Sequence, residues 1–361
     1  MTSTGSAART LRRVSRAILK WSLIGLVSVT ALAFLTESYF KIQNARRFPP
    51  PGKLYQVGKH KMHIWCEGSG EPTIVLDSGA GMFSSGWRWV MPELSSSTRV
   101  CAFDRSGLGW SEVSRPPYDG ISAAHELNEL LQQAGVRSPF IYVGHSLGGN
   151  LGGIYHQQYP NELSALIMLE PANPEILLQE VGEDRGAPVV RGKPISDCGM
   201  RCVMVAFASS LGVIDIALEQ IDAVNDPLYH EQALDEFKAR INRTQALQFL
   251  AQRGKYITEI MFQSIESKEY GDLPVAIFHS ENAGELLGDN RSNPLEMRED
   301  REQGVLAYAN ALTLSSQPLG LTKISQANHL TMVMYEKPAQ QVSGRVLEIL
   351  QLLREQKSGS G

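Results

Sequence analysis

The sequence has little cysteine and no excess of either charge. Four cysteines in 361 residues are too few for a disulfide-based scaffold. Lys and Arg number 34 and Asp and Glu 38, so the formal net charge is −4 and gives no electrostatic reason to expect a nucleic-acid partner. Repeats and low-complexity tracts are absent, and one long apolar run is too few for a multi-span membrane protein. The 43% of apolar residues is typical of a globular protein with a large core.

The single long apolar run lies near the start of the chain. Trp21–Thr36 carries no charge, and with its flanks the run gives roughly 20–24 residues at 17–40, enough for one transmembrane anchor. Five basic residues precede it and three follow closely, so the positive-inside rule places the main domain outside the cytoplasm. The alternative is a signal peptide cleaved after Ala31-Leu32-Ala33, which would make the protein secreted.

From residue 54 the chain alternates strand-like and helix-like segments. Short apolar runs such as Phe140–Val143 and Leu166–Leu169 are typical of parallel strands buried on both faces. The alternation stops after residue 171, continues with about 100 residues of helical pattern, and resumes at Pro274–Phe278. We therefore predict an α/β fold, a mostly parallel, doubly wound sheet with an inserted α-helical cap, preceded by one transmembrane helix. The expected parts are a basic tail (1–16), the anchor (17–40), a linker (41–53), the α/β core (54–171 and 273–357), the cap (172–272) and an added linker (358–361).

The clearest chemical motif is Gly144-His145-Ser146-Leu147-Gly148. This G-x-S-x-G pattern stands directly after a predicted strand and before a predicted helix, which is where a nucleophile elbow occurs. A serine on so tight a turn has a strained backbone, and side chains two residues away on either side would collide. Glycines at 144 and 148 remove those collisions. The motif therefore predicts that Ser146 is a nucleophile.

A serine needs a base within hydrogen-bond reach to become nucleophilic at neutral pH. Of the eight histidines, His145 should point away from the serine, and most of the others fall within predicted strands or helices. His279 ends a strand and is the only rival. His329 lies in a loop after the last predicted strand, where the base of a Ser–acid–His chain order occurs. We predict that His329 is the base.

Four motifs in order resemble the α/β-hydrolase fold superfamily, in its serine-hydrolase (esterase- and lipase-like) branch with a helical cap. They are Val75–Gly81, Asp104–Ser111, Gly144–Gly149 and Asn328-His329, spread over some 300 residues. The resemblance implies oxyanion donors from the backbone N–H groups of Ala80 and Leu147. Relatives often carry His-Gly where this chain has Ser78-Gly79, but only the backbone donates. The Asp104–Ser111 motif we interpret as a structural turn.

The acid of the triad departs from the commonest pattern. Many relatives have an Asp shortly after the strand that matches Pro274–Phe278, and Ala283 occupies that place here. Glu170, at the end of the preceding strand, is at a point where some relatives place their catalytic acid, and we predict that it orients His329. Glu281 and Glu285 are the alternatives.

The remaining predictions concern the cysteines and the reaction. Cys66 and Cys101 fall on neighbouring strands and could form a disulfide, as could Cys198 and Cys202 in the cap; free, buried thiols are the alternative. We expect no metal and no cofactor. The predicted function is hydrolysis of a carboxylic ester of a small, fairly apolar substrate through an acyl-enzyme. Amidase, lactonase or thioesterase activity on the same triad, or a non-catalytic membrane-tethered binding protein, are the alternatives. Epoxide hydrolase and dehalogenase chemistry would require Asp at position 146.

Overall fold

The computed structural model describes residues 4–115, 117–175, 177–178, 191, 229–241, 256–281 and 294–359. Some predictions lie outside these ranges. They are the helical pattern at Val203–Val224, the cysteines Cys198 and Cys202, and the alternative acid Glu285.

One eight-stranded sheet forms the centre of the molecule, with its strands in the order β1-β2-β4-β3-β5-β6-β7-β8. The strands are β1 (Lys53–Val57), β2 (His60–Glu67), β3 (Ile74–Asp77), β4 (Val100–Phe103), β5 (Phe140–His145), β6 (Leu163–Leu169), β7 (Val275–Ser280) and β8 (Pro318–Ile324). The pairs β1–β2 and β2–β4 are antiparallel, and the five other pairs are parallel. The predicted mostly parallel sheet is confirmed. Strand β1 was not predicted, because only Val57 of its five residues is buried and it shows no apolar run.

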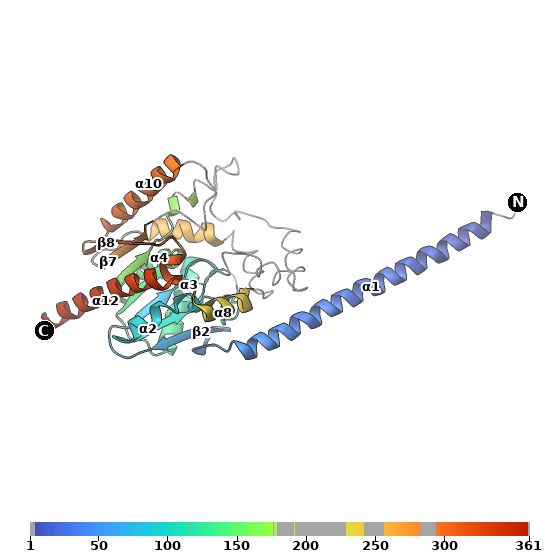
Figure 1. The fold of residues 1–361 in the computed structure, drawn as a ribbon, viewed down its shortest axis with the longest axis horizontal. Coiled ribbons are helices and arrows are strands. Elements are labelled where there is room, and N and C mark those ends of the chain that lie inside the picture. Colours follow the sequence, from blue (N-terminus) through green and yellow to red (C-terminus); the bar gives the residue numbers. More distant parts are fainter. Residues whose placement is uncertain are drawn as a thin grey trace.

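Helices cover both faces of the sheet, so the core has two halves (Figure 1). Alternate residues of the buried strands face opposite sides: Ile74 and Leu76 of β3 join one hydrophobic cluster and Val75 joins the other. Helices α2 (Val90–Ser95), α11 (Thr331–Met334) and α12 (Glu336–Gly359) cover the first face. Helices α3 (Gly120–Gln133), α4 (Leu147–Gln158) and α10 (Pro294–Leu312) cover the second. Parallel strands buried on both sides need this double cover.

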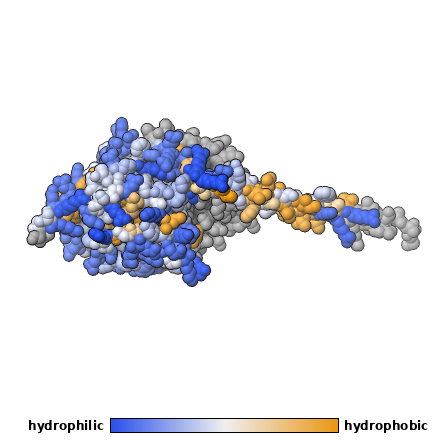
Figure 2. All heavy atoms as spheres, turned by 90° about the horizontal axis from the view of Figure 1, so that it is seen from below, coloured by the Kyte–Doolittle hydropathy of each residue, from blue (hydrophilic) through white to orange (hydrophobic). Residues whose placement is uncertain are grey.

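The N-terminal helix α1 (Thr4–Arg47) projects from the body of the molecule (Figure 1). Its segment Arg13–Thr36 has a mean hydropathy of 2.0 over its most apolar part, which is not buried at all within the chain. Figure 2 shows these apolar side chains along the projecting helix. By length and composition the segment is able to cross a membrane, and a signal sequence would have the same character. The helix also extends through residues 41–47, into the segment predicted as a linker, and β1 begins before that predicted linker ends.

Part of the predicted cap is described. Helix α8 (Glu231–Ile241) packs on the short 3₁₀ helix η1 (Ser84–Trp87), and Phe237 stacks on Phe83 with ring centroids 5.9 Å apart. Residues 256–266 are also helical, as predicted. Asn44, near the end of α1, donates to the Ala239 carbonyl of α8 at 3.4 Å, so α8 contacts both the N-terminal helix and the core.

Candidate active site

Ser146 lies on a strained turn between β5 and α4. Its backbone has φ 52° and ψ −121°, a conformation that non-glycine residues rarely adopt. A Cβ on Gly144 would lie 2.3 Å from the carbonyl oxygen of Gly148, and one on Gly148 would lie 2.5 Å from that of Asp77. Both distances are far below van der Waals contact, so the turn requires both glycines. Helix α4 begins at the next residue, Leu147, so its N-terminus, with unpaired N–H groups, adjoins the serine.

His329 lies next to the serine hydroxyl. Its Nε2 is 2.9 Å from Ser146 Oγ, which is hydrogen-bond distance. The loop that carries it, between β8 and α11, is fixed by Asn328, whose side-chain oxygen accepts hydrogen bonds from the backbone N–H groups of Leu330 and Thr331. His279, the rival base, instead places its Nδ1 3.0 Å from the Ser280 carbonyl and its ring beside Tyr308.

Glu170 lies on the other side of the His329 ring. Its Oε2 is 3.8 Å from His329 Nδ1, an ion-pair distance that is longer than a hydrogen bond. The residue is 2% exposed, directly follows β6 and has a positive φ of 47°. Its backbone N–H donates to Phe278 of β7 at 2.7 Å, and Ser280 N–H donates to its carboxylate at 3.3 Å. These bonds to β7 hold the carboxylate toward the histidine loop.

Glu281, the alternative acid, is held by other groups. Its carboxylate accepts from the backbone N–H of Gln326 at 3.0 Å and lies 3.1 Å from Lys323 Nζ. These two partners, the amide first, lower the pKa of Glu281. Its side chain is 44% exposed, so it belongs to the surface beside β8. Of these two acids, the structure thus brings Glu170 to His329.

The loop expected to supply an oxyanion donor runs close to Ser146. A Cβ on Gly79 would lie 3.4 Å from Ser146 Cβ and 3.0 Å from the Nδ1 atom of His145, so a larger residue would not fit there without movement. Ala80 follows Gly79 in this loop. Ser78, which departs from the His-Gly of many relatives, accepts a hydrogen bond from Trp87 Nε1 at 2.9 Å.

His145 has a role that the sequence did not reveal. Its Nε2 lies 2.7 Å from the backbone carbonyl of His329, and its side chain is buried. Burial, together with the nearby His329, lowers the pKa of His145 to about 3. The ring is therefore neutral at physiological pH, and because a carbonyl only accepts, Nε2 carries the proton. His145 thus anchors the loop of the predicted base.

Cys66 and Cys101 form a disulfide in the structure. They are directly opposite each other in the register of β2 and β4. Of the two alternatives, the structure therefore has the disulfide and not the free thiols. Among the residues that the structure describes, no group of three or more His, Cys, Asp and Glu side chains is arranged to hold a metal ion.

Comparison with known proteins agrees with this architecture. A family model described as the alpha/beta hydrolase fold matches residues 72–186, which include the loop of Gly79 and Ala80, the serine turn and Glu170. The chain has the α/β-hydrolase fold. A putative lipase from Acinetobacter baumannii superimposes with a TM-score of 0.57 at 17% identity, covering 88% of this chain and 97% of that one. The haloalkane dehalogenase variant DbeA-M1 from Bradyrhizobium elkanii also gives 0.57, at 13% identity and 86% and 99% coverage. Identities this low establish the fold and leave the reaction open.

The curated relatives match over shorter stretches. The putative carbamate hydrolase RutD of Stutzerimonas stutzeri is 38% identical over 95 residues, 25% of this chain and 36% of that protein. The uncharacterized protein YbdG of Bacillus subtilis is 27% identical over 157 residues, 43% of this chain and 48% of that protein. The match therefore spans less than half the length of each of these two relatives.

Proposed function

We propose that this α/β-hydrolase is a serine hydrolase that cleaves a carboxylic ester through an acyl-enzyme intermediate. The observation that carries the proposal is the line of three side chains: Ser146 Oγ lies 2.9 Å from His329 Nε2, and the Glu170 carboxylate faces His329 Nδ1 at 3.8 Å. A nucleophile, a base and an acid that orients the base form the arrangement needed for acyl transfer.

Each group has one task in the proposed reaction. Ser146 Oγ attacks the ester carbonyl while His329 Nε2 accepts the hydroxyl proton. His329 then protonates the leaving alkoxide, and an acyl-enzyme remains on Ser146. Water, deprotonated by the same nitrogen, attacks the acyl carbonyl, and the imidazolium returns its proton to Ser146 Oγ as the acid product leaves. Glu170 keeps the proton of neutral His329 on Nδ1 and stabilises the charged imidazolium, while the N–H groups of Ala80 and Leu147 bind the oxyanion.

The surroundings of the serine favour a fairly apolar substrate. Leu147 and Leu151 of α4 belong to one hydrophobic cluster with Ile260 and Met261 of the cap, and Ala80 packs against it. An apolar acyl or alcohol group beside Ser146 would contact this cluster. Epoxide hydrolases and haloalkane dehalogenases, which are among the structural neighbours, need an Asp nucleophile, and Ser146 supports acyl transfer instead. Amides, lactones and thioesters remain alternatives that the same groups could cleave.

A fluorophosphonate probe and a series of p-nitrophenyl esters test the proposal. We expect the probe to label the protein, Ser146→Ala to abolish labelling and ester hydrolysis, and Ser96→Ala, at an exposed serine, to leave both intact. Measuring the esters in order of acyl-chain length identifies the preferred substrate size. Absence of labelling in the folded, unmodified protein would support the non-catalytic alternative.

We further propose that α1 anchors the protein in a membrane as a single-pass helix, with the hydrolase domain outside the cytoplasm. Support comes from the length and apolar character of Arg13–Thr36 and from the excess of basic residues before it. We expect the full-length chain to stay with membranes in alkaline carbonate and to be digested by protease added to spheroplasts. A shortened chain in the soluble fraction would indicate a cleaved signal peptide instead.

A further inference from the structure

Two adjacent residues at the end of β4 point their charges to different parts of the molecule. Asp104 accepts hydrogen bonds from the backbone N–H groups of Ser84 and Trp110, each at 2.8 Å, and thereby fixes its own turn. Arg105 instead reaches the loop beside Ser146: its guanidinium donates to the Ser78 carbonyl at 2.5 Å and to the Gly79 carbonyl at 2.6 Å. The interpretation of this motif as a structural turn therefore accounts for Asp104 and leaves Arg105 unexplained.

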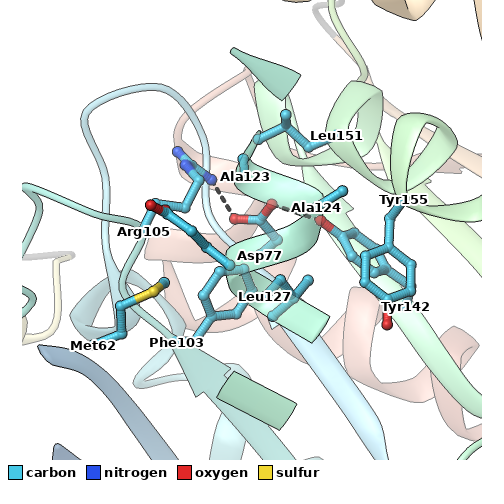
Figure 3. Close-up of a pocket in the computed structure, with 11 residues that line it drawn as sticks. Met62, Asp77, Phe103, Arg105, Ala123, Ala124, Leu127, Tyr142, Leu151 and Tyr155 are labelled. Carbon is cyan, nitrogen blue, oxygen red and sulfur yellow. Dashed lines mark hydrogen bonds and ion pairs between the residues drawn. The ribbon is translucent and has the colours of Figure 1, made fainter. Parts of the chain in front are cut away.

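Asp77 holds the guanidinium in place. This carboxylate, which is 1% exposed, forms an ion pair with Arg105 and accepts a hydrogen bond from the Tyr142 hydroxyl at 2.6 Å. Figure 3 shows Arg105, Asp77 and Tyr142 in line, enclosed by apolar side chains such as Phe103 and Leu127. The ion pair is thus shielded from water, and it limits the orientations open to the guanidinium.

The Gly79 carbonyl is the part of this arrangement that bears on catalysis. In a planar trans peptide the C=O of one residue and the N–H of the next point in opposite directions. Fixing the Gly79 oxygen on Arg105 therefore fixes the direction of the Ala80 N–H, the proposed oxyanion donor. Glycine leaves this peptide plane free to rotate, so another contact has to hold it. The Gly79 oxygen also accepts from the Met82 backbone N–H at 3.2 Å, and Arg105 adds a shorter, charge-assisted hydrogen bond, which is stronger than a neutral one.

We propose that Arg105 is a positioning residue that holds the Gly79–Ala80 peptide with its N–H directed at the oxyanion, and that Asp77 in turn orients Arg105. The inference rests on the proposed serine hydrolase function and extends it. A guanidinium suits the task because one of its terminal nitrogens reaches Asp77 and Ser78 while the other reaches Gly79. An ammonium group in the same place could not span all three acceptors.

The test compares two arginines of the same strand region. Arg99, at the opposite end of β4, also donates to two backbone carbonyls, those of Ala134 and Gly135, far along the strand from the serine turn. We would make Arg105→Met together with Asp77→Asn, so that no unpaired carboxylate stays buried, and Arg99→Met as the matched control. The readouts are kcat and KM for a p-nitrophenyl ester and the inhibition constant of a trifluoromethyl ketone, whose adduct carries the oxyanion.

We expect the double variant to lose about 100-fold in kcat and a similar factor in affinity for the ketone, with KM within about threefold, since one oxyanion donor is misplaced. Arg99→Met should leave all three values unchanged. A folded double variant with kcat and ketone affinity within threefold of the parent overturns the inference. If the double variant does not fold, Arg105→Lys decides: a kcat at least tenfold lower supports the inference, and an unchanged kcat overturns it.

Failure of the inference and failure of the proposed function give different results. If Ser146→Ala keeps full ester hydrolysis, the serine hydrolase proposal is wrong and the Arg105 inference falls with it. If Ser146→Ala is inactive while the Arg105 variants are fully active, the function stands and only the role of Arg105 is wrong.

Discussion

In the part of the chain that the structure describes, the His329–Glu170 and His63–Asp104 pairs differ in what faces the second ring nitrogen of the histidine. In the His329–Glu170 pair the other nitrogen lies 2.9 Å from Ser146 Oγ. In the His63–Asp104 pair the Nδ1–Oδ2 distance is 3.0 Å, and Nε2 accepts a hydrogen bond from the Gly52 backbone N–H at 3.1 Å. His63 and Asp104 are fully buried, whereas the His329 side chain is 15% exposed.

The difference shows that a histidine–acid pair does not by itself make a base. Because His63 Nε2 already accepts from an amide, its lone pair is occupied and no hydroxyl can give it a proton. Burial alone would raise the pKa of Asp104, but His63 and the amides of Trp110 and Ser84 lower it overall. The His63 pair thus connects the start of β1 to the turn after β4. Only the His329 pair offers a free nitrogen to a nucleophile.

Removing the acid from the His329 pair should have the largest effect on activity. Glu170→Gln keeps the size of the side chain but favours the wrong histidine tautomer and no longer stabilises the imidazolium. We expect kcat for a p-nitrophenyl ester to fall by about 10³–10⁴-fold. Glu281→Gln is the matched control and should keep near-normal turnover, because that carboxylate binds Lys323 and Gln326. The reverse result would assign the acid to Glu281.

The same change in the His63 pair should affect stability and leave the chemistry intact. Asp104→Asn puts an N–H₂ group where the carboxylate accepts from buried donors, and we expect the free energy of unfolding to fall by about 3 kcal/mol. Urea unfolding measures this, and fluorophosphonate titration should give an unchanged kcat per folded site. A variant of unchanged stability that has lost activity would contradict the comparison.

The stability difference between the parent and Asp104→Asn should depend on pH, because folding lowers the pKa of Asp104. The pKa of Asp104 is lowered in the folded state, so its stabilisation is complete above the pKa of an unfolded aspartate. We expect the gap between parent and Asp104→Asn to be constant from pH 5 to 8. It should shrink as the pH falls below about 4, toward the folded pKa.

Local patterns made the elbow and the histidine predictable. The turn around Ser146 requires glycine on both sides for steric reasons, so the motif is visible in the sequence. The place of His329 follows from the order of serine, acid and histidine along the chain. Glu170 could be predicted because the commoner acid position holds Ala283. The contact of His145 with the His329 carbonyl spans 184 positions, and the contact of Arg105 with Gly79 joins the ends of two strands. Neither contact can be predicted from a local sequence pattern.

Two features of the fold, the Cys66–Cys101 disulfide and helix α10, could not be predicted from the sequence pattern. The Cys66–Cys101 disulfide depended on the two residues being directly opposite in β2 and β4, which composition and spacing do not determine. Helix α10 was not predicted, because its sequence mixes charged and small residues with apolar ones and shows no clear apolar face.

A third histidine–carboxylate pair extends the comparison. His60 Nε2 lies 3.6 Å from Glu126 Oε1, and the two side chains are 11% and 20% exposed. Burial raises the pKa of Glu126 to about 7 and lowers that of His60. At pH 7 about half of Glu126 is therefore protonated and His60 is mostly neutral, so the two side chains rarely carry opposite charges at the same time. Burial of the Glu126 carboxylate therefore lowers the stability of the folded state near neutral pH.

Glu126→Gln should therefore be the mildest change and should stabilise the protein. A carboxyl whose folded pKa lies near 7 binds its proton more tightly folded than unfolded, so stability decreases as the pH rises from about 4.5 to 7. The variant avoids this loss, and with the side chain one-fifth exposed we expect a gain on the order of 1–3 kcal/mol at pH 8. At pH 4.5 the gain should be much smaller, because the folded state is then almost fully protonated and the unfolded state about half protonated. Urea unfolding at the two pH values measures it, and the same gain at both would show that the glutamine acts through packing, with no part played by the charge.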